Sequence, residues 1–570
     1  MIATATREKI DALFSQFSQP GSPGCALGIM QDGEMVYQQG YGLADLERNV
    51  AITPSTRFYI ASMAKQFTGM AIAMLATASQ LDLDADIRSI LPYVPDFGHT
   101  ITPRHLLHHT SGLRSDIFLL IASGWRIEDV IRQEDIVDFV KAQRELDFIP
   151  GEEFSYCGTG YSLLAEIVAA VSGQSFASFC HERMFAPLEM ENTRFEEDPL
   201  ALIPHRASTY FGTGEEAYKK AVLTIGILGG TGLYSTVEDL AKWDADLATG
   251  SVVGRQALDL VMTPATLNSG DTIPYGFGLI VDEHRGRPTL HHGGDSAGVH
   301  CYFLRFPEEP LTVVLLGNAS TVKASALVYQ VADLLLDPHQ ASEESAAPES
   351  TSVEADLPAD VVAARAGRYY DARTGAFIDL LFQDDILSVH GYELVPASAN
   401  EYFLRQHPSI VMVFSESADG GVEASVDFGT GSATYRQVDS IDPTPDKLAA
   451  YVGSYRSPEL DVIWRIELDG DRLVAHRFRQ GTSSLIPICE DTFADPWAGE
   501  ILHGDAQWVI SFEREDGAIS GLRLTAAGAR GRNLWFGKVE SAGIEQPSPS
   551  VDHDLAERSC FEGDPYHSTT

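Results

Sequence analysis

The sequence predicts an α+β domain followed by two antiparallel β-barrels, and three observations support this fold class. Segments with helical and strand periodicity alternate up to about residue 336. A stretch rich in Ser, Glu, Ala and Pro then interrupts the periodicity. Strand-and-turn patterns occupy the chain beyond it. We therefore expect the α+β domain over 1–336, a linker over 337–358, barrels over 359–440 and 447–540, and a disordered tail over 541–570.

One antiparallel sheet is expected to join the two ends of the first domain. Near its start, an Asp32-Gly33 turn connects two apolar strands in a hairpin. The elements expected around this sheet are a helix over 10–17, strands over 25–30, 34–39, 277–281, 291–306 and 311–316, and a helix over 323–336. Between the strands, helical spacing and its stop signals predict helices after Ser62 and Thr102 and over 114–147, 161–171 and 237–247, with a glycine loop at 229–233.

The two barrels are predicted by an internal repeat. Gly367-Arg368-Tyr369 and Gly453-Ser454-Tyr455 are each followed, at the same offsets, by two apolar residues, an aspartate and a leucine. We interpret the two segments as copies of one β unit, each long enough for a small antiparallel barrel.

Composition excludes several classes of partner. The 570 residues include 81 acidic and 40 basic side chains, a formal charge of −41. Such a charge repels nucleic acid and anionic membrane surfaces, and its simplest effect is solubility. We see neither an apolar run long enough for a membrane span nor a signal peptide, so we expect a cytoplasmic protein. The six scattered cysteines are expected to be free thiols, as in a reducing compartment.

The first indication of a catalytic site is the pair Ser62 and Lys65, at the start of a predicted apolar helix. Residues three apart lie on one helical face, so the lysine amine can reach the serine hydroxyl. A hydroxyl is a weak nucleophile until a base takes its proton, and Ser-x-x-Lys is the smallest local unit that supplies one. The pair by itself also occurs by chance in long chains, where it does no more than begin a helix.

Two further segments carry side chains suited to the same chemistry. Tyr156 just precedes a predicted helix, so its phenol can enter a cleft, although a loop tyrosine packed on the surface is the simpler interpretation. His292 precedes Gly293 and Gly294 within a predicted strand, where glycines allow a ligand close to the backbone. The alternative there is a hairpin with a bulge.

Histidine clusters do not predict a metal site. His291-His292 has no acidic partner at ligand spacing, and the stretch from His105 to His109 lacks the glutamate of a zinc-protease helix. We therefore expect neither a metal nor a cofactor.

Together, Ser62-x-x-Lys65, Tyr156-x-Gly158 and His292-x-Gly294 have the order and separations of the serine β-lactamase and penicillin-recognising enzyme superfamily. Over about residues 10–336 the chain resembles the class C-like branch of this superfamily. Because two β units follow that domain, the chain is most similar to D-aminopeptidases, in which two eight-stranded antiparallel barrels follow the catalytic domain. The resemblance implies the same architecture here.

The resemblance implies a role for each matched side chain. Ser62 would be the acylated nucleophile, and Lys65 would help remove its proton. Tyr156 would relay protons to the leaving amine and to the deacylating water. His292 would hydrogen-bond the substrate and the tyrosine network.

The resemblance also implies an oxyanion hole. It would consist of the backbone N–H groups of Ser62 and of Asp295, the residue just past Gly294. Donors of this kind each contribute about 3–4 kcal/mol in the transition state.

One position departs from the family pattern. Where the family has Tyr-x-Asn, this chain has Gly158. That asparagine usually contacts the lysine and the amide carbonyl of the substrate, so its absence argues against an ordinary β-lactamase. Thr159 is a neighbouring side chain that could substitute for it.

The resemblance predicts a serine hydrolase that releases N-terminal D-amino acids from short peptides, amides or esters through a Ser62 acyl-enzyme. Its partner would be a small-molecule or short-peptide substrate. Acidic residues near the pocket would hold the ammonium group of that substrate. A loop at Ala494–Gly504 is expected to reach the active site from the last barrel. The alternatives are β-lactamase-like, D,D-carboxypeptidase-like or esterase activity, and a weakly catalytic penicillin- or peptide-binding protein. The oligomeric state is open, with a homodimer as one option.

Overall fold

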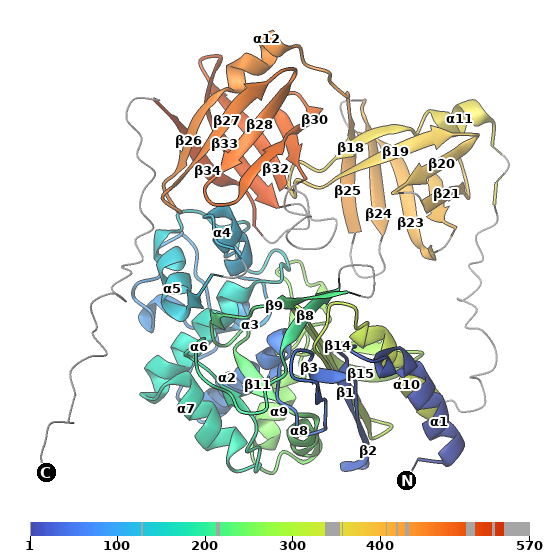
Figure 1. The fold of residues 1–570 in the computed structure, drawn as a ribbon. Coiled ribbons are helices and arrows are strands. Elements are labelled where there is room, and N and C mark those ends of the chain that lie inside the picture. The colour runs from blue at the N-terminus through green and yellow to red at the C-terminus, as the bar shows by residue number, and fades with distance from the viewer. Residues whose placement is uncertain are drawn as a thin grey trace, which may run out of the picture.

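The computed structural model describes residues 2–126, 129–212, 217–336, 354–355, 357–390, 392–405, 407–417, 420–427, 432–496, 508–526 and 531–540. An α+β domain comes first, and two antiparallel barrels follow it and lie over one side of it (Figure 1). This confirms the predicted fold class. Most of the predicted linker and all of the predicted tail lie outside the described residues.

A six-stranded antiparallel sheet joins the two ends of the first domain, as the pattern predicted. The link between the two ends is the pairing of β1 (Cys25–Gln31) with β17 (Leu311–Gly317), in which Cys25 lies opposite Gly317. The strand order is β14-β15-β16-β17-β1-β2, with the other bounds β2 (Glu34–Tyr41), β14 (Ile280–His284), β15 (Arg287–Ser296) and β16 (Val299–Phe306).

Several predicted elements differ in extent from the observed ones. The strand predicted over 291–306 is two strands, β15 and β16, because the chain reverses at Ala297-Gly298, where Gly298 has φ +68°. The helical pattern over 114–147 contains two helices, α4 (Asp116–Ala122) and α5 (Gln133–Ala142), because Gly124, at φ +96°, follows the first of them. The helix predicted over 10–17 begins earlier, at Thr4. The sequence pattern did not predict this start, because the first turn is polar and carries no apolar periodicity.

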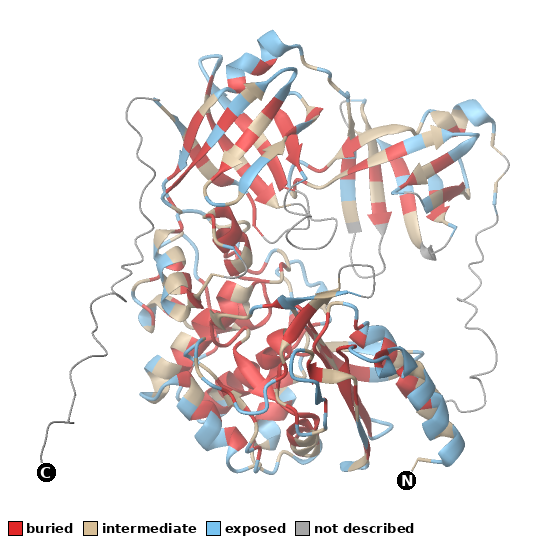
Figure 2. Cartoon of the chain, viewed as in Figure 1, coloured by how far each residue is buried: buried red, intermediate tan, exposed pale blue. Residues whose placement is uncertain are grey.

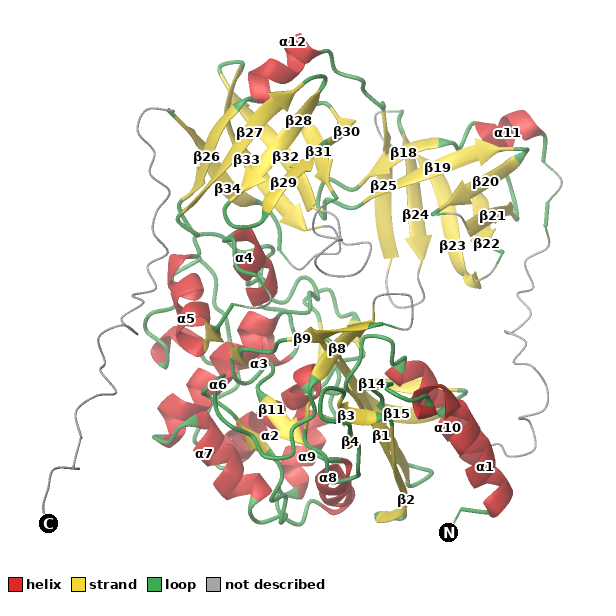
Figure 3. Ribbon diagram, in the orientation of Figure 1, coloured by secondary structure: helices red, strands yellow, loops and turns green. Residues whose placement is uncertain are grey.

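Helices cover both faces of the sheet (Figure 3). α1 (Thr4–Leu13) and α10 (Ala324–Leu336) bury one apolar face against it. On the other face, α2 (Lys65–Thr77) and α8 (Val237–Thr249) meet through Phe67 and Trp243, whose ring centroids are 4.5 Å apart. The remaining helices of the domain are η1 (Ser15–Ser18), η2 (Ala61–Ala64), η3 (Ile87–Ser89), α3 (Pro103–Leu107), α4 (Asp116–Ala122), α5 (Gln133–Ala142), α6 (Gly158–Ser172), α7 (Phe176–Cys180), η4 (His181–Phe185) and α9 (Arg255–Val261).

Short strands complete the α+β domain. They form two- and three-stranded sheets around the helices, and β11 pairs with both β5 and β7 beside the α2 segment. Their bounds are β3 (Leu43–Asp45), β4 (Val50–Ala51), β5 (Phe58–Tyr59), β6 (Ile131–Arg132), β7 (Arg194–Phe195), β8 (Thr209–Gly212), β9 (Tyr218–Ala221), β10 (Ile225–Gly226), β11 (Leu233–Ser235), β12 (Ala265–Thr266) and β13 (Thr272–Ile273).

Among the described helices, none taken singly has the length and apolarity needed to cross a bilayer. Two helical segments, Gly158–Ser172 and Phe176–Phe185, have that length and apolarity only when they are taken together, and they are bent by 78° relative to each other. Both members contribute side chains to the main core of the domain.

The first barrel is closed and has eight antiparallel strands in sequence order. A short helix, α11 (Ala359–Ala363), precedes it. The strands are β18 (Gly367–Tyr370), β19 (Phe377–Gln383), β20 (Ile386–Val389), β21 (Tyr392–Pro396), β22 (Glu401–Leu404), β23 (His407–Glu416), β24 (Val422–Asp427) and β25 (Ser432–Val438).

The second barrel has nine described strands rather than the eight that the resemblance implies. The additional strand arises because Leu485 interrupts one stretch of chain and separates β29 from β30. These two strands stand at opposite ends of the sheet order, so the sheet nearly closes on itself through that stretch. The elements are α12 (Pro445–Leu448), η5 (Ala449–Tyr451), β26 (Gly453–Ser457), β27 (Val462–Asp469), β28 (Arg472–Arg477), β29 (Gly481–Ser484), β30 (Ile486–Cys489), β31 (Thr492–Asp495), β32 (Trp508–Glu515), β33 (Ala518–Ala526) and β34 (Leu534–Val539).

The repeated Gly-x-Tyr segments occupy equivalent places in the two barrels. Each forms the first strand, and each tyrosine is buried and donates its hydroxyl to the carbonyl four residues before it. The Tyr369 bond measures 3.0 Å and the Tyr455 bond 2.6 Å. The same local interaction therefore anchors the start of both barrels.

Helix α4 belongs to the first domain in sequence but packs into the core of the second barrel (Figure 2). The rings of Phe118 and Trp508 lie 5.8 Å apart, and Trp464 Nε1 donates to the Ala122 carbonyl at 3.4 Å. Burial of this apolar helix forms a hydrophobic link between the first domain and the second barrel.

Candidate active site

Ser62 and Lys65 are in contact at the centre of the first domain. Ser62 lies on η2, a 3₁₀ turn that runs directly into α2 at Lys65. Lys65 Nζ is 3.1 Å from Ser62 Oγ and donates to the Gly230 carbonyl at 2.8 Å. Lys65 is almost fully buried, whereas Ser62 is partly exposed. The predicted nucleophile is therefore open to a ligand, and the amine is held beneath it.

The backbone around Ser62 is tightly constrained. Ala61 has φ +46°, a conformation that residues with a side chain seldom adopt and that is concentrated at functional sites. A Cβ on Gly294 would lie 2.2 Å from the Ile60 carbonyl oxygen, so only glycine lets β15 approach this turn so closely. The strand segment Gly294-Asp295 thus lies beside Ser62. The oxyanion role of the Ser62 and Asp295 N–H groups stays a prediction.

Tyr156 and His292 lie on the same side of the fold as Lys65. Lys65 Nζ is 4.8 Å from the centre of the Tyr156 ring, a distance at which a cation is attracted to the ring face. The Tyr156 and His292 rings are 6.1 Å apart. The structure therefore brings together four side chains from three separate segments of the sequence.

His292 is held as a neutral ring by its neighbours. Its Nδ1 lies 2.6 Å from the Gly293 carbonyl, which can only accept, so Nδ1 carries the proton. Burial, and then the charge of Lys65, lower the His292 pKa to about 3. The unprotonated Nε2 accepts from the Tyr275 hydroxyl at 3.0 Å. His292 thus contacts the tyrosine network through Tyr275, for which no sequence motif indicated a role in the site.

His109 is a second residue that the sequence did not indicate for this site. Its ring centre is 4.3 Å from that of Tyr156 and 4.7 Å from that of Tyr275. His109 Nδ1 accepts the Cys157 N–H at 3.1 Å. Burial lowers the pKa of His109 well below its usual value, so the ring packs in its neutral form and orients Tyr156.

Gly158 lies against Asp116 at the start of α6. A Cβ on residue 158 would lie only 2.3 Å from Asp116 Oδ1. Thr159 does not substitute for the missing asparagine, because its Oγ1 donates to the Arg114 carbonyl at 2.8 Å. The space that a side chain at 158 would need is therefore taken by the Asp116 carboxylate, which no sequence motif indicated.

The cysteine beside Tyr156 is not a competing nucleophile. Cys157 is buried, and burial raises its pKa to about 12. A thiol that stays protonated at neutral pH is a weak nucleophile. The described cysteines are all free thiols, as predicted: Cys25, Cys157, Cys180, Cys301 and Cys489.

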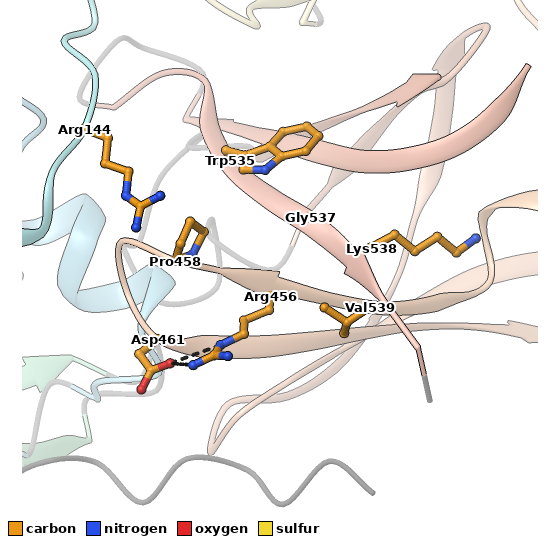
Figure 4. Close-up of a pocket in the computed structure, with 8 residues that line it drawn as sticks. All are labelled: Arg144, Arg456, Pro458, Asp461, Trp535, Gly537, Lys538 and Val539. Carbon is orange, nitrogen blue, oxygen red and sulfur yellow. Dashed lines mark hydrogen bonds and ion pairs between the residues drawn. The ribbon is translucent and has the colours of Figure 1, made fainter. Parts of the chain in front are cut away.

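A separate hollow of about 500 Å³ lies on the second barrel, next to Arg144 of the first domain (Figure 4). Its cationic side chains are Arg144, Arg456 and Lys538, and Arg456 is paired with Asp461. None of the four predicted catalytic side chains lines it. The predicted active-site loop Ala494–Gly504 begins at the end of β31, and its residues from 497 onward lie outside the described residues.

Buried histidines are expected to make the folded state less stable in mild acid. Burial lowers the pKa of His292 to about 3 and those of His108 and His291 to about 4. The unfolded chain, with histidine pKa values near 6.5, therefore binds protons first as the pH falls. Each of the three histidines should cost about 1.6 kcal/mol between pH 6.5 and 5. Burial raises the pKa of Asp147 to about 6, so this carboxyl gains stability over the same range and offsets most of the cost of one histidine.

Melting temperatures measured from pH 7.5 to 5 would test this expectation. A His291→Gln variant removes one of the titrating groups and should flatten the decline, whereas His181→Gln, at an exposed position, should not. A melting temperature that is constant over this range would contradict the expectation.

The fold and this group of side chains define a serine hydrolase. The model of the family described as Beta-lactamase matches residues 10–336, and the chain belongs to this family.

Comparisons with known proteins place the similarity along most of the chain. A D-aminopeptidase from Gluconobacter oxydans (strain 621H) is 27% identical over 527 residues, which cover 90% of this chain and 95% of that protein. The octameric penicillin-binding protein homologue from Pyrococcus abyssi shares the fold with a TM-score of 0.52 at 21% identity, over 84% of this chain and 99% of that one. The D-amino acid amidase from Ochrobactrum anthropi SV3, in complex with L-phenylalanine amide, has a TM-score of 0.51 at 23% identity, over 60% of this chain and all of that one (100%). The family match confirms the predicted superfamily, and the chain is similar to a D-aminopeptidase along most of its length, as predicted.

Proposed function

We propose that this serine hydrolase is a D-stereospecific aminopeptidase that releases N-terminal D-amino acids from short peptides, amides or esters. The observation that carries the proposal is the 3.1 Å contact between Ser62 Oγ and Lys65 Nζ beside the Tyr156 ring. The similarity to a D-aminopeptidase along nearly its whole length supports the substrate class. A homodimer stays a prediction.

In the proposed first half-reaction, Ser62 Oγ attacks the carbonyl carbon of the substrate and passes its proton to Lys65 Nζ. The tetrahedral intermediate then collapses, the bond to the leaving group breaks, and an amine leaving group takes the proton from Lys65 Nζ through the Tyr156 hydroxyl. In the second half-reaction, water attacks the acyl-enzyme and its proton passes through Tyr156 to Lys65 Nζ. The bond from the acyl carbon to Ser62 Oγ then breaks, and Lys65 returns the proton to that oxygen. Backbone N–H groups beside Ser62 would stabilise the oxyanion in both halves.

Hydrolysis of D- and L-alanine p-nitroanilide tests the proposal. We expect kcat/KM for the D-enantiomer to exceed that for the L-enantiomer about 100-fold. Only one enantiomer can place its amine and its side chain in their binding positions while its carbonyl carbon faces Ser62. A chromogenic β-lactam and a fluorophosphonate serve as comparison compounds. Equal rates for the two enantiomers would contradict D-stereospecificity. Turnover of the β-lactam alone would favour the β-lactamase-like alternative, and acylation of Ser62 without turnover would favour a binding protein.

A further inference from the structure

Asp116 is a buried carboxylate at the catalytic site to which the proposed mechanism assigns no role. It is the first residue of α4 and is only 9% exposed. Its Oδ1 occupies the space beside Gly158 that any larger residue at 158 would need. A Cβ on Gly230, whose carbonyl accepts from Lys65, would lie 3.5 Å from the Gly158 carbonyl oxygen and 3.6 Å from Lys65 Nζ. Asp116 therefore adjoins the segment that lines the site next to Lys65.

Asp116 forms no ion pair with any residue that the structure describes. Oδ1 accepts hydrogen bonds from Ser115 Oγ at 3.0 Å and from the Ile117 N–H at 2.9 Å. Neither donor is a cation, and among the described residues no lysine, arginine or histidine pairs with this carboxylate. A buried carboxylate without a positive partner is costly, and it persists where a cation from outside can complete it.

The chemistry of this position selects a donor cation rather than a carbonyl. The side-chain amide of an asparagine at 158 could donate a hydrogen bond to the acyl carbonyl oxygen of an N-acylated substrate. An ionised carboxylate can only accept, and it binds a primary ammonium through charge-assisted hydrogen bonds. We propose that Asp116 binds the α-ammonium of the substrate's N-terminal residue and so selects free amines over N-acylated ones. This inference rests on the proposed aminopeptidase function and names the residue that would determine its specificity.

The fold holds this carboxylate in a fixed position. Beyond Asp116, α4 is buried in the core of the second barrel, through the Phe118 and Trp508 rings and the bond from Trp464 to the Ala122 carbonyl. Gln480 of the barrel also donates to the Ile121 carbonyl at 2.9 Å. Little conformational entropy is lost when such a group binds its partner, which favours tight and selective binding.

An Asp116→Asn variant tests the inference because it preserves the shape of the side chain and removes its charge. The readout is the ratio of kcat/KM for D-alanine p-nitroanilide to kcat/KM for N-acetyl-D-alanine p-nitroanilide. Loss of a desolvated charge pair should lower this ratio about 100-fold. Asp138→Asn is the matched control: its carboxylate is 72% exposed on α5 and pairs with Lys141, so its ratio should equal that of the wild type.

Two further measurements keep the test decisive if Asp116→Asn does not fold. On the wild-type protein, D-lactic acid p-nitroanilide carries a hydroxyl in place of the ammonium, and we expect its kcat/KM to be about 100-fold below that of the D-alanine compound. An Asp116→Ala/Gly158→Asn variant removes the carboxylate and places an amide donor in the space that it leaves. The ratio of kcat/KM for the two substrates should then shift toward the N-acetyl compound. Fluorophosphonate labelling of Ser62 verifies that each variant has folded.

The outcomes separate the two proposals. If the wild type hydrolyses D-alanine p-nitroanilide but Asp116→Asn retains the wild-type ratio, or if the D-lactic acid compound is an equal substrate, the Asp116 inference is wrong and the proposed function stands. If the wild type hydrolyses only N-acylated substrates, the proposed function is wrong as well.

Discussion

A Ser62→Ala variant is expected to lose hydrolysis of D-alanine p-nitroanilide by about 10⁴-fold or more in kcat, because the acyl-enzyme can no longer form. Some acceleration over the uncatalysed reaction should remain, since the site beside Gly294 can still bind and polarise the substrate. The first measurement is kcat. The second is the mass of the protein after incubation with a fluorophosphonate, which should bind covalently to the wild type and not to the variant.

The matched control for this substitution is Ser89→Ala. Ser89 is exposed on η3, where its hydroxyl donates to the Asp86 carbonyl at 2.7 Å, so its loss should leave kcat unchanged. Full D-alanyl amidase activity in Ser62→Ala would show that another group is the nucleophile, and the proposed mechanism would have to be abandoned.

An Arg114→Met variant is expected to lower the free energy of unfolding by about 3–5 kcal/mol. Arg114 is fully buried between the first domain and the second barrel. Its guanidinium donates to Glu459 Oε2 at 2.9 Å and to the Arg532 carbonyl at 2.9 Å, and it lies 3.3 Å from Asp147 Oδ1. Methionine fills much of the same space but leaves the two carboxylates buried without this cation.

The expected loss can be measured as the urea midpoint of the first unfolding transition, followed by tryptophan fluorescence. In an Arg114→Met/Glu459→Met variant one stranded charge is also removed, so this double variant should be more stable than the single one. Arg472→Met is the control: its side chain is 60% exposed beside Asp471, and its loss should cost about 0.5 kcal/mol or less. A midpoint in Arg114→Met equal to that of the wild type would show that the cluster does not stabilise the junction.

The Arg114 substitution should also affect the catalytic site. The Arg114 carbonyl accepts from Thr159, and Asp116 follows two residues later at the start of α4. Loosening this junction would displace the carboxylate that we propose to bind the ammonium. We therefore expect Arg114→Met to reduce the preference for free amines more than it reduces the acylation of Ser62. Fluorophosphonate labelling measures the acylation separately.

Much of the fold was predictable because its signals are local. Helical spacing marked α2, α6, α8 and α10, and the Asp-Gly turn marked the β1–β2 hairpin. The repeated Gly-x-Tyr segments predicted two barrels, and the tyrosine bonds to the residues four positions earlier are the physical content of that repeat. The boundaries that differed, such as the division of 291–306 into β15 and β16, depended on a single turn glycine within a continuous apolar pattern.

The sequence by itself determined the family and the Ser62–Lys65 pair, because a spacing of three residues is enough to bring an amine to a hydroxyl on one helical face. It also determined which segments would carry Tyr156 and His292, since their order along the chain matched a known pattern. Only the tertiary structure decided what surrounds them. His109 and Tyr275 join the site through packing, and Asp116 fills the space beside Gly158 because the second barrel buries the helix that carries it. These contacts join residues far apart in sequence, so no local spacing encodes them.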